Sequence, residues 1–323
     1  MTHAIRMHKT GGPEVLAWEE VALGKPGPGE VRLRHTAVGL NYIDTYHRSG
    51  LYPLPLPTII GSEGAGIVEE AGAGVTDLKP GDRVAYAGAL GAYAETRNAP
   101  ADRLVAIPKG VSDQQAAAMM LKGMTAQYLI RRTYRVKSGD TILIHAAAGG
   151  VGLIVCQWAK HLGATVIGTV GSEEKAALAK QHGCDYPIIY TREDFVARVK
   201  ELTQGKKVPV VYDSVGKDTF MKSLDCLAPL GLLASFGQSS GAVGPVDLGI
   251  LAPKGSLYVT RPTMGTYVAK REDLLATANE LFDVVAKGIV KIGINQTYAL
   301  KDAAQAHRDL QARKTTGSTV FTV

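Results

Sequence analysis

The run that most constrains the fold is Thr141–Gly152, which reads TILIHAAAGGVG. Its opening residues, Ile142–Ile144, are apolar without alternation, which is typical of a parallel strand buried on both faces. Small residues and glycines follow, and after them apolar residues recur at helical spacing. This order of strand, glycine turn and helix predicts the opening unit of a dinucleotide-binding fold, with the pyrophosphate at the amino end of the helix.

The glycine pattern departs from G-x-G-x-x-G at one place, because Ala147 takes the position of the first glycine. The residues expected to present backbone N–H groups to the pyrophosphate are Gly149, Gly150 and Val151. A second apolar strand, Thr165–Val170, follows within about 20 residues, where the ribose-reading position belongs. The alternative is a glycine turn that only packs a helix on a sheet.

The end of this second strand indicates which dinucleotide binds. NAD sites usually carry Asp or Glu there, to accept from the ribose 2′-hydroxyl. The sequence instead has Gly171 and Ser172, with Lys175 one helical turn later, and a hydroxyl with an ammonium suits a 2′-phosphate. Tyr190 and Arg192 are expected to cover the adenine and add positive charge. NADPH is therefore predicted over NADH, although Lys175 could be an ordinary solvated residue and two glutamates beside it weaken the case.

The chain has 323 residues, 46% of them hydrophobic, and 37 glycines. This length predicts two domains, and the composition is typical of a glycine-punctuated α/β enzyme. No stretch approaches the roughly 18 uninterrupted apolar residues of a membrane span. The first residues read as a strand without the apolar core of a signal peptide, so a cytoplasmic protein is predicted.

The net charge is +6 and the isoelectric point about 9.1, yet the basic residues are scattered. The densest runs are only Arg131–Arg132 and Lys206–Lys207, which argues against a nucleic-acid reader. The cysteines, Cys156, Cys184 and Cys226, are widely spaced. They predict buried reduced thiols rather than a disulfide framework or a cysteine zinc site.

The character of the chain changes near Ser112. Before it, short apolar strands alternate with Gly/Pro turns, which predicts a β-rich half with strands at 4–7, 31–38, 66–71, 83–86 and 92–98. Ser112 with Gln115 forms a capping-box pattern, and helical segments are expected after it at 116–121 and 125–131. Beyond them strands and helices alternate as in a parallel sheet covered by helices. The expected strands are 141–145, 165–170, 187–190, 208–212, 230–236 and 257–260, and the expected helices between them are 151–162, 173–182, 193–203 and 217–226. The domains are predicted as 1–122 with 267–323, and 123–266.

Several motifs resemble the quinone oxidoreductases, the zeta-crystallin-like, zinc-free branch of the medium-chain dehydrogenase/reductase superfamily. The motifs are Gly39–Tyr46 (GLNYIDTY), Gly50–Tyr52 (GLY), Gly61–Gly66 (GSEGAG), Gly81–Val84 (GDRV), Ala146–Gly152 (AAAGGVG) and Tyr212–Gly216 (YDSVG). They run from the first strands into the second domain in the expected order. The resemblance implies an α/β protein with a GroES-like β-rich catalytic domain, a Rossmann domain that binds NADPH, and a homodimer or homotetramer.

The resemblance also marks where zinc enzymes of the superfamily differ. Those enzymes carry a cysteine and a Gly-His-Glu motif where this chain has Val38–Asn41 and Gly61–Glu63, and a cysteine-rich lobe that is missing here. A tetrahedral zinc site needs thiolate or imidazole ligands, so no zinc is expected. His47 is interpreted as a packing or surface residue.

The resemblance places Tyr46, Tyr52 and Arg261 around the nicotinamide as the catalytic candidates. Without a metal, hydrogen-bond donors must stabilise the charge that develops on a carbonyl oxygen when hydride arrives. Tyr46 or Arg261 could supply that donor, or the tyrosines could be only the walls of a flat pocket. Asn41 is expected to contact the nicotinamide ribose or ring.

Further cofactor contacts are expected elsewhere. The resemblance points to Thr125 and Tyr128 in the cofactor cleft and to Lys314 in a loop that folds toward the dinucleotide, although Lys314 could be a solvated charge. Cofactors sit at the carboxyl edge of such sheets. The strand ends expected at that edge are Ser214, Phe236, Gly237, Gln238 and Ser239.

The function predicted is reduction of quinones by hydride transfer from NADPH without a metal. One alternative is an NADPH-dependent alkenal or enone reductase. A second, from another class, is a structural or RNA-binding protein that holds NADPH. An apolar edge strand at 257–260 invites pairing, so a homodimer through that strand is expected.

Overall fold

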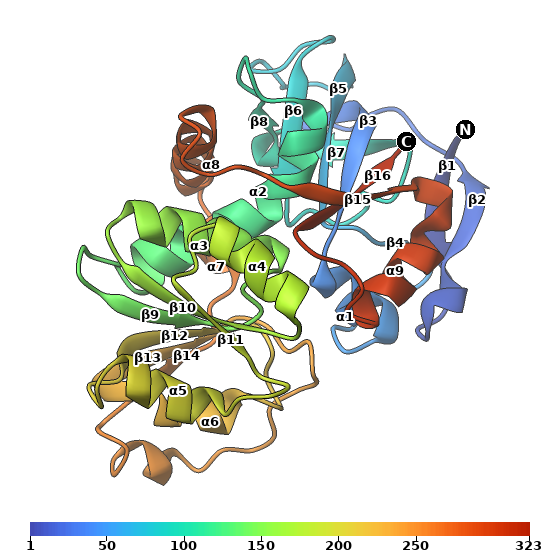
Figure 1. Ribbon diagram of the computed structural model, residues 1–323. Coiled ribbons are helices and arrows are strands. Elements are labelled where there is room, and N and C mark those ends of the chain that lie inside the picture. Colours follow the sequence, from blue (N-terminus) through green and yellow to red (C-terminus); the bar gives the residue numbers. More distant parts are fainter. The chain divides into compact units, whose positions relative to one another are not determined.

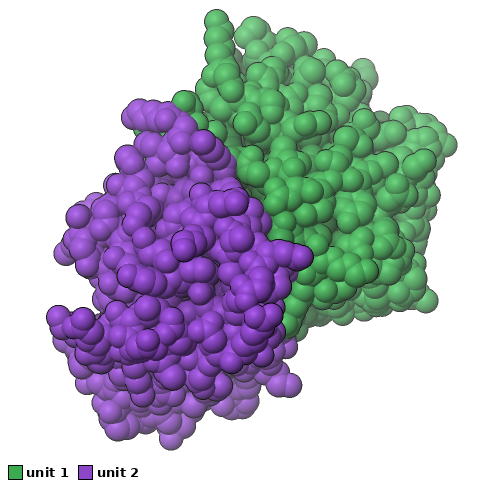
Figure 2. Space-filling model, in the orientation of Figure 1, with its two compact units in different colours: residues 1–124, 268–286, 292–323 green, residues 125–267, 287–291 purple.

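The computed structural model describes residues 1–323 and divides them into two compact units (Figure 2). Unit 1 contains residues 1–124, 268–286 and 292–323, and unit 2 contains residues 125–267 and 287–291. The chain therefore leaves the first unit, builds the second and returns. The short stretch 287–291, expected with the β-rich domain, groups with unit 2.

Unit 1 is built mainly on antiparallel strands, as the alternation of short apolar runs and turns predicts, and only β15 and β16 pair in parallel (Figure 1). One sheet has seven strands in the order β15-β16-β3-β5-β6-β8, with β7 paired to β3, and a smaller one has the order β2-β1-β4. The strands are β1 (Thr2–Met7), β2 (Ala17–Val21), β3 (Glu30–Leu40), β4 (Thr58–Ile59), β5 (Glu63–Ala71), β6 (Arg83–Ala87), β7 (Thr96–Pro100), β8 (Val105–Ala106), β15 (Ile294–Ala299) and β16 (Ser318–Thr322).

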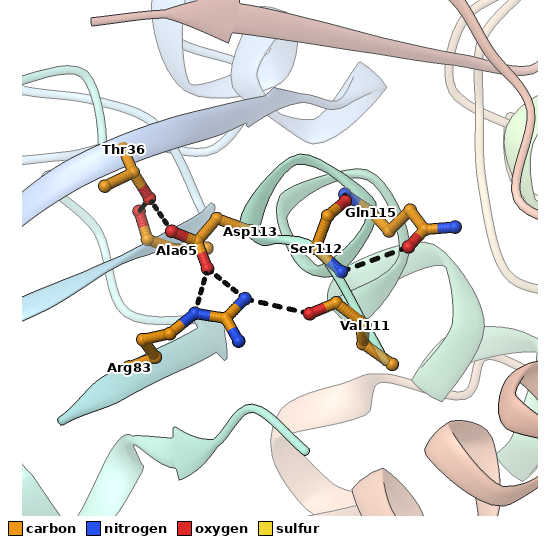
Figure 3. A network of polar contacts seen from close by, with 7 residues as sticks. All are labelled: Thr36, Ala65, Arg83, Val111, Ser112, Asp113 and Gln115. Carbon is orange, nitrogen blue, oxygen red and sulfur yellow. Dashed lines mark hydrogen bonds and ion pairs between the residues drawn. The ribbon is translucent and has the colours of Figure 1, made fainter. Parts of the chain in front are cut away.

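Four helices belong wholly or mainly to unit 1: α1 (Tyr42–Ser49), α2 (Asp113–Tyr128), α8 (Arg271–Ala286) and α9 (Ala303–Gln311). The predicted capping box before α2 is confirmed, since the side chains of Ser112 and Gln115 each accept a hydrogen bond from the other's backbone N–H at 3.1 Å (Figure 3). Asp113 then accepts from Thr36 of β3 at 2.7 Å and from Arg83 of β6 at 2.8 Å, which fastens the start of α2 to the sheet.

Unit 2 is a six-stranded, all-parallel sheet in the order β11-β10-β9-β12-β13-β14. Its strands are β9 (Thr141–Ile144), β10 (Thr165–Val170), β11 (Tyr186–Ile189), β12 (Val208–Asp213), β13 (Leu227–Ser235) and β14 (Tyr258–Thr260). Helices α3 (Gly150–His161) and α4 (Glu173–Gln181) cover one face, and α5 (Phe195–Leu202) and α6 (Phe220–Asp225) cover the other (Figure 1). A short α7 (Met264–Tyr267) ends the unit's main segment.

The strand order reverses direction at β9, since β10 and β11 lie on one side of it and β12 to β14 on the other. Doubly wound sheets bind ligands at such a reversal, outside the carboxyl ends of the strands that flank it, here β9 and β12. The strands and helices predicted for this half are confirmed in type and order. Each observed boundary lies within three residues of the predicted one.

Some expectations about the β-rich half were wrong. The sequence suggested a strand over Ala92–Asn98, but β7 begins only at Thr96, because the preceding residues bend from the left-handed Gly91 and make only an isolated bridge to β1. The helical segments expected at 116–121 and 125–131 are one helix, α2, which continues as a π-helix over Leu129–Thr133. The elements of this half that were not foreseen are β2, β4, β8, β15 and α1.

Candidate functional site

The predicted pyrophosphate loop lies between β9 and α3. Ala146 takes a left-handed conformation with φ 54°, and Gly149 stands at the N-cap of α3 without a side chain to cap the helix. The N–H groups of Gly150, Val151 and the next residue form the first turn, so they have no partner within the helix. The helix end therefore offers the donors and the positive dipole end that an anion requires.

Gly152 explains how closely the helix approaches this loop. A Cβ added to Gly152 would lie 2.3 Å from the carbonyl oxygen of Ala146 and 2.6 Å from that of Ala147. Both obstacles are backbone atoms, which cannot rotate away. Gly149 is less crowded, with its nearest neighbour, the Ala146 oxygen, at 3.2 Å. The cradle fits a pyrophosphate only while position 152 has no side chain.

A buried polar network, which no local sequence pattern indicates, supports the loop from below. His145 bonds to Thr169 Oγ1 through Nδ1 (2.8 Å) and to Ser223 Oγ through Nε2 (2.9 Å), and Ser223 donates to Asp213 at 3.1 Å. Burial lowers the pKa of His145, which favours the neutral ring. These bonds join the carboxyl ends of β9, β10 and β12 beneath the loop.

The residues expected to distinguish NADPH from NADH lie together at the end of β10. Ser172 caps α4 by accepting from the backbone N–H of Lys175 at 3.3 Å, so its hydroxyl hydrogen is available to a phosphate oxygen. Tyr190 stands over Gly171, since a Cβ on Gly171 would lie 3.0 Å from the phenol oxygen. No carboxylate occupies the end of β10. The donors at this end of β10 fit the chemistry of a 2′-phosphate.

The structure qualifies the charge expected from Arg192. Its guanidinium pairs with Glu173 at 2.6 Å, and both side chains are about two-thirds exposed. An exposed pair of this kind is weak and rearranges readily. Arg192 is therefore paired with Glu173 in a contact that an anionic ligand could replace.

The later strand ends also come together. A Cβ on Gly237 would lie 2.6 Å from the carbonyl oxygen of Ser214, and that oxygen accepts from the backbone N–H of Ser239 at 3.1 Å. Arg261 Nη1 donates to the carbonyl oxygens of Ser235 and Gly237, each at 2.8 Å. Phe236 and Gln238 lie in the same turn. Arg261 thus anchors the run 236–239 at the carboxyl edge of the sheet.

Two aromatic rings lie near Arg261 within unit 2. Tyr128 stacks on Tyr267 with ring centroids 4.4 Å apart and planes 9° from parallel. Burial raises the pKa of Tyr128 to about 12, although its hydrogen bond with Thr125 and the charge of Arg261 act in the opposite direction. Tyr128 therefore stays protonated at neutral pH. Thr125, Tyr128 and Arg261 are brought together, as expected of residues that line one site.

In unit 1, Asn41 is held by buried charges that were not predicted from the sequence as site residues. Asn41 Nδ2 donates to Glu63 Oε2 at 2.8 Å, and Lys122 Nζ contacts the same oxygen at 2.8 Å. Glu63 is fully buried, and the side chain of Lys122 is 8% exposed. Such a buried pair needs several hydrogen bonds to offset its desolvation, and the backbone N–H of Leu121 supplies another.

Helix α1 and the turn that follows it bring the tyrosine candidates together. The rings of Tyr46 and Tyr52 lie 5.3 Å apart in an edge-to-face arrangement, and Tyr42 lies 5.6 Å from Tyr46. Tyr46 is buried and Tyr52 half-buried. His47 is buried against Tyr52, so its interpretation as a packing residue is confirmed over that as a surface residue. The geometry supports an aromatic wall, with the phenol of Tyr46 as a candidate donor.

Lys314 lies in the loop after α9 in unit 1. Its backbone N–H donates to the carbonyl oxygen of Asp309 at 3.0 Å, and its ammonium lies 3.7 Å from the Asp309 carboxylate. The side chain is 71% exposed, in keeping with either a solvated charge or a contact to an anion.

The structure contains no group of three or more His, Cys, Asp or Glu side chains able to hold a metal ion. No helix is long and apolar enough to cross a membrane. The chain inserts a doubly wound parallel unit, with a glycine cradle at its first helix, between segments of a mainly antiparallel β-rich unit. This arrangement defines the medium-chain dehydrogenase/reductase class.

Comparison with known proteins agrees with this class. Residues 27–109 match the model of the alcohol dehydrogenase GroES-like domain, and residues 150–282 match that of the zinc-binding dehydrogenases. A quinone oxidoreductase of Pseudomonas aeruginosa is 59% identical, and a 2-haloacrylate reductase of Burkholderia sp is 49% identical, each over 99% of both chains. The chain belongs to the quinone oxidoreductase family.

A solved structure gives the same result in three dimensions. The structure of Escherichia coli quinone oxidoreductase complexed with NADPH superposes with a TM-score of 0.98, is 53% identical, and covers 99% of this chain and 100% of that one. The two units of this protein are therefore a GroES-like domain and a Rossmann-like domain.

Proposed function

We propose that this protein reduces quinones by hydride transfer from NADPH, without a metal. The observation that carries the proposal is the open amino end of α3, where Gly152 brings the helix into contact with the loop and the first N–H groups have no capping side chain. The substrate class is supported by relatives of 59% and 53% identity named quinone oxidoreductase. NADPH is supported by the complex that matches this chain with a TM-score of 0.98.

Residues of unit 2 bind and orient the cofactor. The loop Gly149–Val151 binds the pyrophosphate through backbone N–H groups. Ser172 and Lys175 bind the 2′-phosphate, the first by its free hydroxyl hydrogen and the second by charge. Tyr190 covers the adenine, and the run 236–239 forms a wall at the carboxyl edge.

When bound, NADPH supplies the hydride. For the acceptor, Tyr46 and Tyr52 form an aromatic wall that suits a flat ring and excludes water from it. The Tyr46 phenol donates a hydrogen bond to the oxygen on which charge develops, and Asn41 contacts the nicotinamide ribose or ring. A hydroquinone anion is a stable product, so no dedicated general acid is needed.

A substrate panel tests the proposal. NADPH oxidation is followed by absorbance with 1,4-benzoquinone, 9,10-phenanthrenequinone and a 2-alkenal at equal concentrations. Turnover at least about tenfold higher in kcat/KM with the quinones supports the proposal. Tight NADPH binding without turnover of any acceptor would instead favour a binding protein.

One relative favours a second candidate function. The 2-haloacrylate reductase is 49% identical over nearly the whole chain, and its name describes reduction of an electron-poor alkene. Such a reaction ends with a proton on carbon. A preference for the alkenal over both quinones would support this candidate.

Two further proposals concern assembly and compartment. Strand β14 pairs only with β13 at the edge of its sheet, and Tyr258 and Val259 are 60% and 39% exposed. We propose that two copies pair there as a homodimer, which sedimentation of the intact protein would test.

The cysteines are all buried free thiols, which supports a reducing compartment, the cytoplasm.

A further inference from the structure

A chain of hydrogen-bonded side chains runs through the interior of unit 1. Ser62 Oγ donates to Asp44 Oδ1 at 2.9 Å, and the Tyr93 hydroxyl lies 3.1 Å from Asp44 Oδ2 and 3.0 Å from His307 Nε2. Arg48 Nη1 lies 3.1 Å from His307 Nδ1. All five side chains are at most 2% exposed. None of them has a part in the function proposed above.

The chemistry of the partners fixes the direction of every bond in this chain. The Tyr93 hydroxyl donates its single hydrogen to Asp44, so its oxygen accepts from His307 Nε2–H. His307 Nδ1 must then accept from Arg48, which has only donors. This is the tautomer of a neutral histidine, and burial lowers the pKa of His307 to about 3.

The chain ties helix α1 to the rest of unit 1 at both of its ends. Asp44 lies in the first turn of α1 and Arg48 in the last, one helical turn apart. Asp44 Oδ2 also accepts from the backbone N–H of Asn41 at 2.9 Å, and Arg48 Nη2 donates to Gln311 of α9 at 2.9 Å. Helix α1 carries Tyr46, and Asn41 is its N-cap residue. The two candidate site residues of this segment therefore depend on how α1 is held.

We propose that Asp44 is a positioning residue for the reaction, and that it acts as the shared hydrogen-bond acceptor which holds α1, and with it Asn41 and Tyr46, in place. The inference rests on the proposed function, because it gives Asn41 and Tyr46 their roles there. What positions the helix is the set of hydrogen bonds, and the negative charge of Asp44 is not required.

The arrangement of donors around Asp44 is the reason to assign the role to its hydrogen bonds and not to its negative charge. Asn41 N and the Tyr93 hydroxyl both reach Oδ2, whereas Oδ1 receives only Ser62. An asparagine could place its oxygen at the Oδ2 position and its amide nitrogen at the Oδ1 position, where the Ser62 hydroxyl can rotate and accept. All three contacts would survive without the charge.

The charged groups around Asp44 are consistent with a carboxylate whose negative charge is tolerated but is not needed to hold α1 in place. Lys122 of α2 favours its ionised form, as do the hydrogen bonds from Asn41, Ser62 and Tyr93, yet burial outweighs them and raises the pKa of Asp44 to about 6. Glu63 of β5 and Arg48 of α1 act on the neighbouring Tyr93 in opposite directions.

The experiment compares three variants of the full chain: Asp44→Asn, Asp44→Ala and Tyr93→Phe. The matched control is Tyr298→Phe, which removes another phenol that donates to a carboxylate of unit 1, Asp309 at 3.0 Å, but has no bond to α1. Two quantities are measured: amide hydrogen exchange of residues 42–49, and kcat/KM for 1,4-benzoquinone with NADPH.

The proposal predicts that Asp44→Ala and Tyr93→Phe speed exchange in 42–49 and lower kcat/KM roughly tenfold or more, with the Kd for NADPH changed less than about threefold. Asp44→Asn restores both quantities to within about threefold of the unchanged protein, and Tyr298→Phe alters neither.

The proposal is overturned if Asp44→Asn is as impaired as Asp44→Ala, because the charge would then be the essential property. It is also overturned if Tyr93→Phe leaves exchange in 42–49 unchanged, a result that stands even if the alanine variant does not fold. Should the unchanged protein reduce no quinone, the proposed function fails, while the exchange data still decide the role of Asp44.

Discussion

Replacing Gly152 by alanine tests the cofactor cradle at its tightest point. The new Cβ would lie 2.3 Å and 2.6 Å from two backbone carbonyl oxygens, distances that Cβ atoms do not adopt. The helix must therefore move away from the loop, and forcing a methyl group into a packed site costs about 1–3 kcal/mol. If that cost falls on the bound state, the Kd for NADPH rises roughly 5- to 150-fold.

The matched control for this prediction is Gly149→Ala in the same loop. Its Cβ would have one close neighbour, at 3.2 Å, and the backbone at Gly149 (φ −82°, ψ 173°) is open to any residue. Titration calorimetry with NADPH should show a clearly larger loss for Gly152→Ala than for Gly149→Ala. Equal affinities for Gly152→Ala and the unchanged protein would refute the reasoning that close helix approach forms the site.

Other predictions follow from individual side chains. Lys175→Ala should weaken NADPH more than NADH, lowering the ratio of their affinities roughly tenfold in direct titrations; an unchanged ratio would remove Lys175 from the 2′-phosphate site. Tyr46→Phe should lower kcat/KM for quinones while the Kd for NADPH stays constant, and full activity would leave Tyr46 only as a wall. Burial raises the pKa of Cys226 to about 12, and the hydrogen bond with Cys184 together with burial raises the pKa of Cys156 well above its usual value, so a thiol reagent should label neither in the folded protein and both after unfolding. Because the folded-state pKa of Asp44 is raised from 3.8 to about 6, its ionisation removes stability as pH rises through that window. The Tm of Asp44→Asn, measured relative to that of the unchanged protein, should therefore rise between pH 4 and pH 7. A constant difference between the two Tm values would contradict this sign.

The cofactor half was predicted well because its signals are local. Strand β10 (Thr165–Val170) has the bounds that were predicted, and the start of α3 differs by one residue. Buried parallel strands and the glycine turn depend on residues that are adjacent in sequence, so a linear pattern suffices. The grouping of Gly171, Ser172 and Tyr190 also followed, since strand ends of a parallel sheet meet at one edge.

The β-rich half was harder, because its elements depend on distant partners. Strand β2 (Ala17–Val21) exists through antiparallel pairing with β1, and its own sequence, AWEEV, alternates weakly. Helix α1 is only eight residues long and polar, too short for periodicity to indicate it. The one local signal was Asn41 followed three residues later by Asp44, a cap pattern that the sequence analysis did not use.

The buried polar groups were the least predictable part of the site. Lys122 and Glu63 lie 59 residues apart in the chain, and Arg48 and His307 lie 259 apart. Nothing in a linear pattern joins such pairs. Their burial becomes visible only when the sheet has brought β5, α1, α2 and α9 together.

The most direct test of the central claim is a single-turnover measurement. Enzyme loaded with one equivalent of NADPH is mixed with 1,4-benzoquinone in a stopped-flow instrument, and the experiment is repeated with NADPH that carries deuterium at the transferred position of the nicotinamide. We predict complete oxidation of the bound cofactor in a single phase that is slower with deuterium, as hydride transfer requires. Bound NADPH that stays reduced in the presence of the quinone would contradict the account.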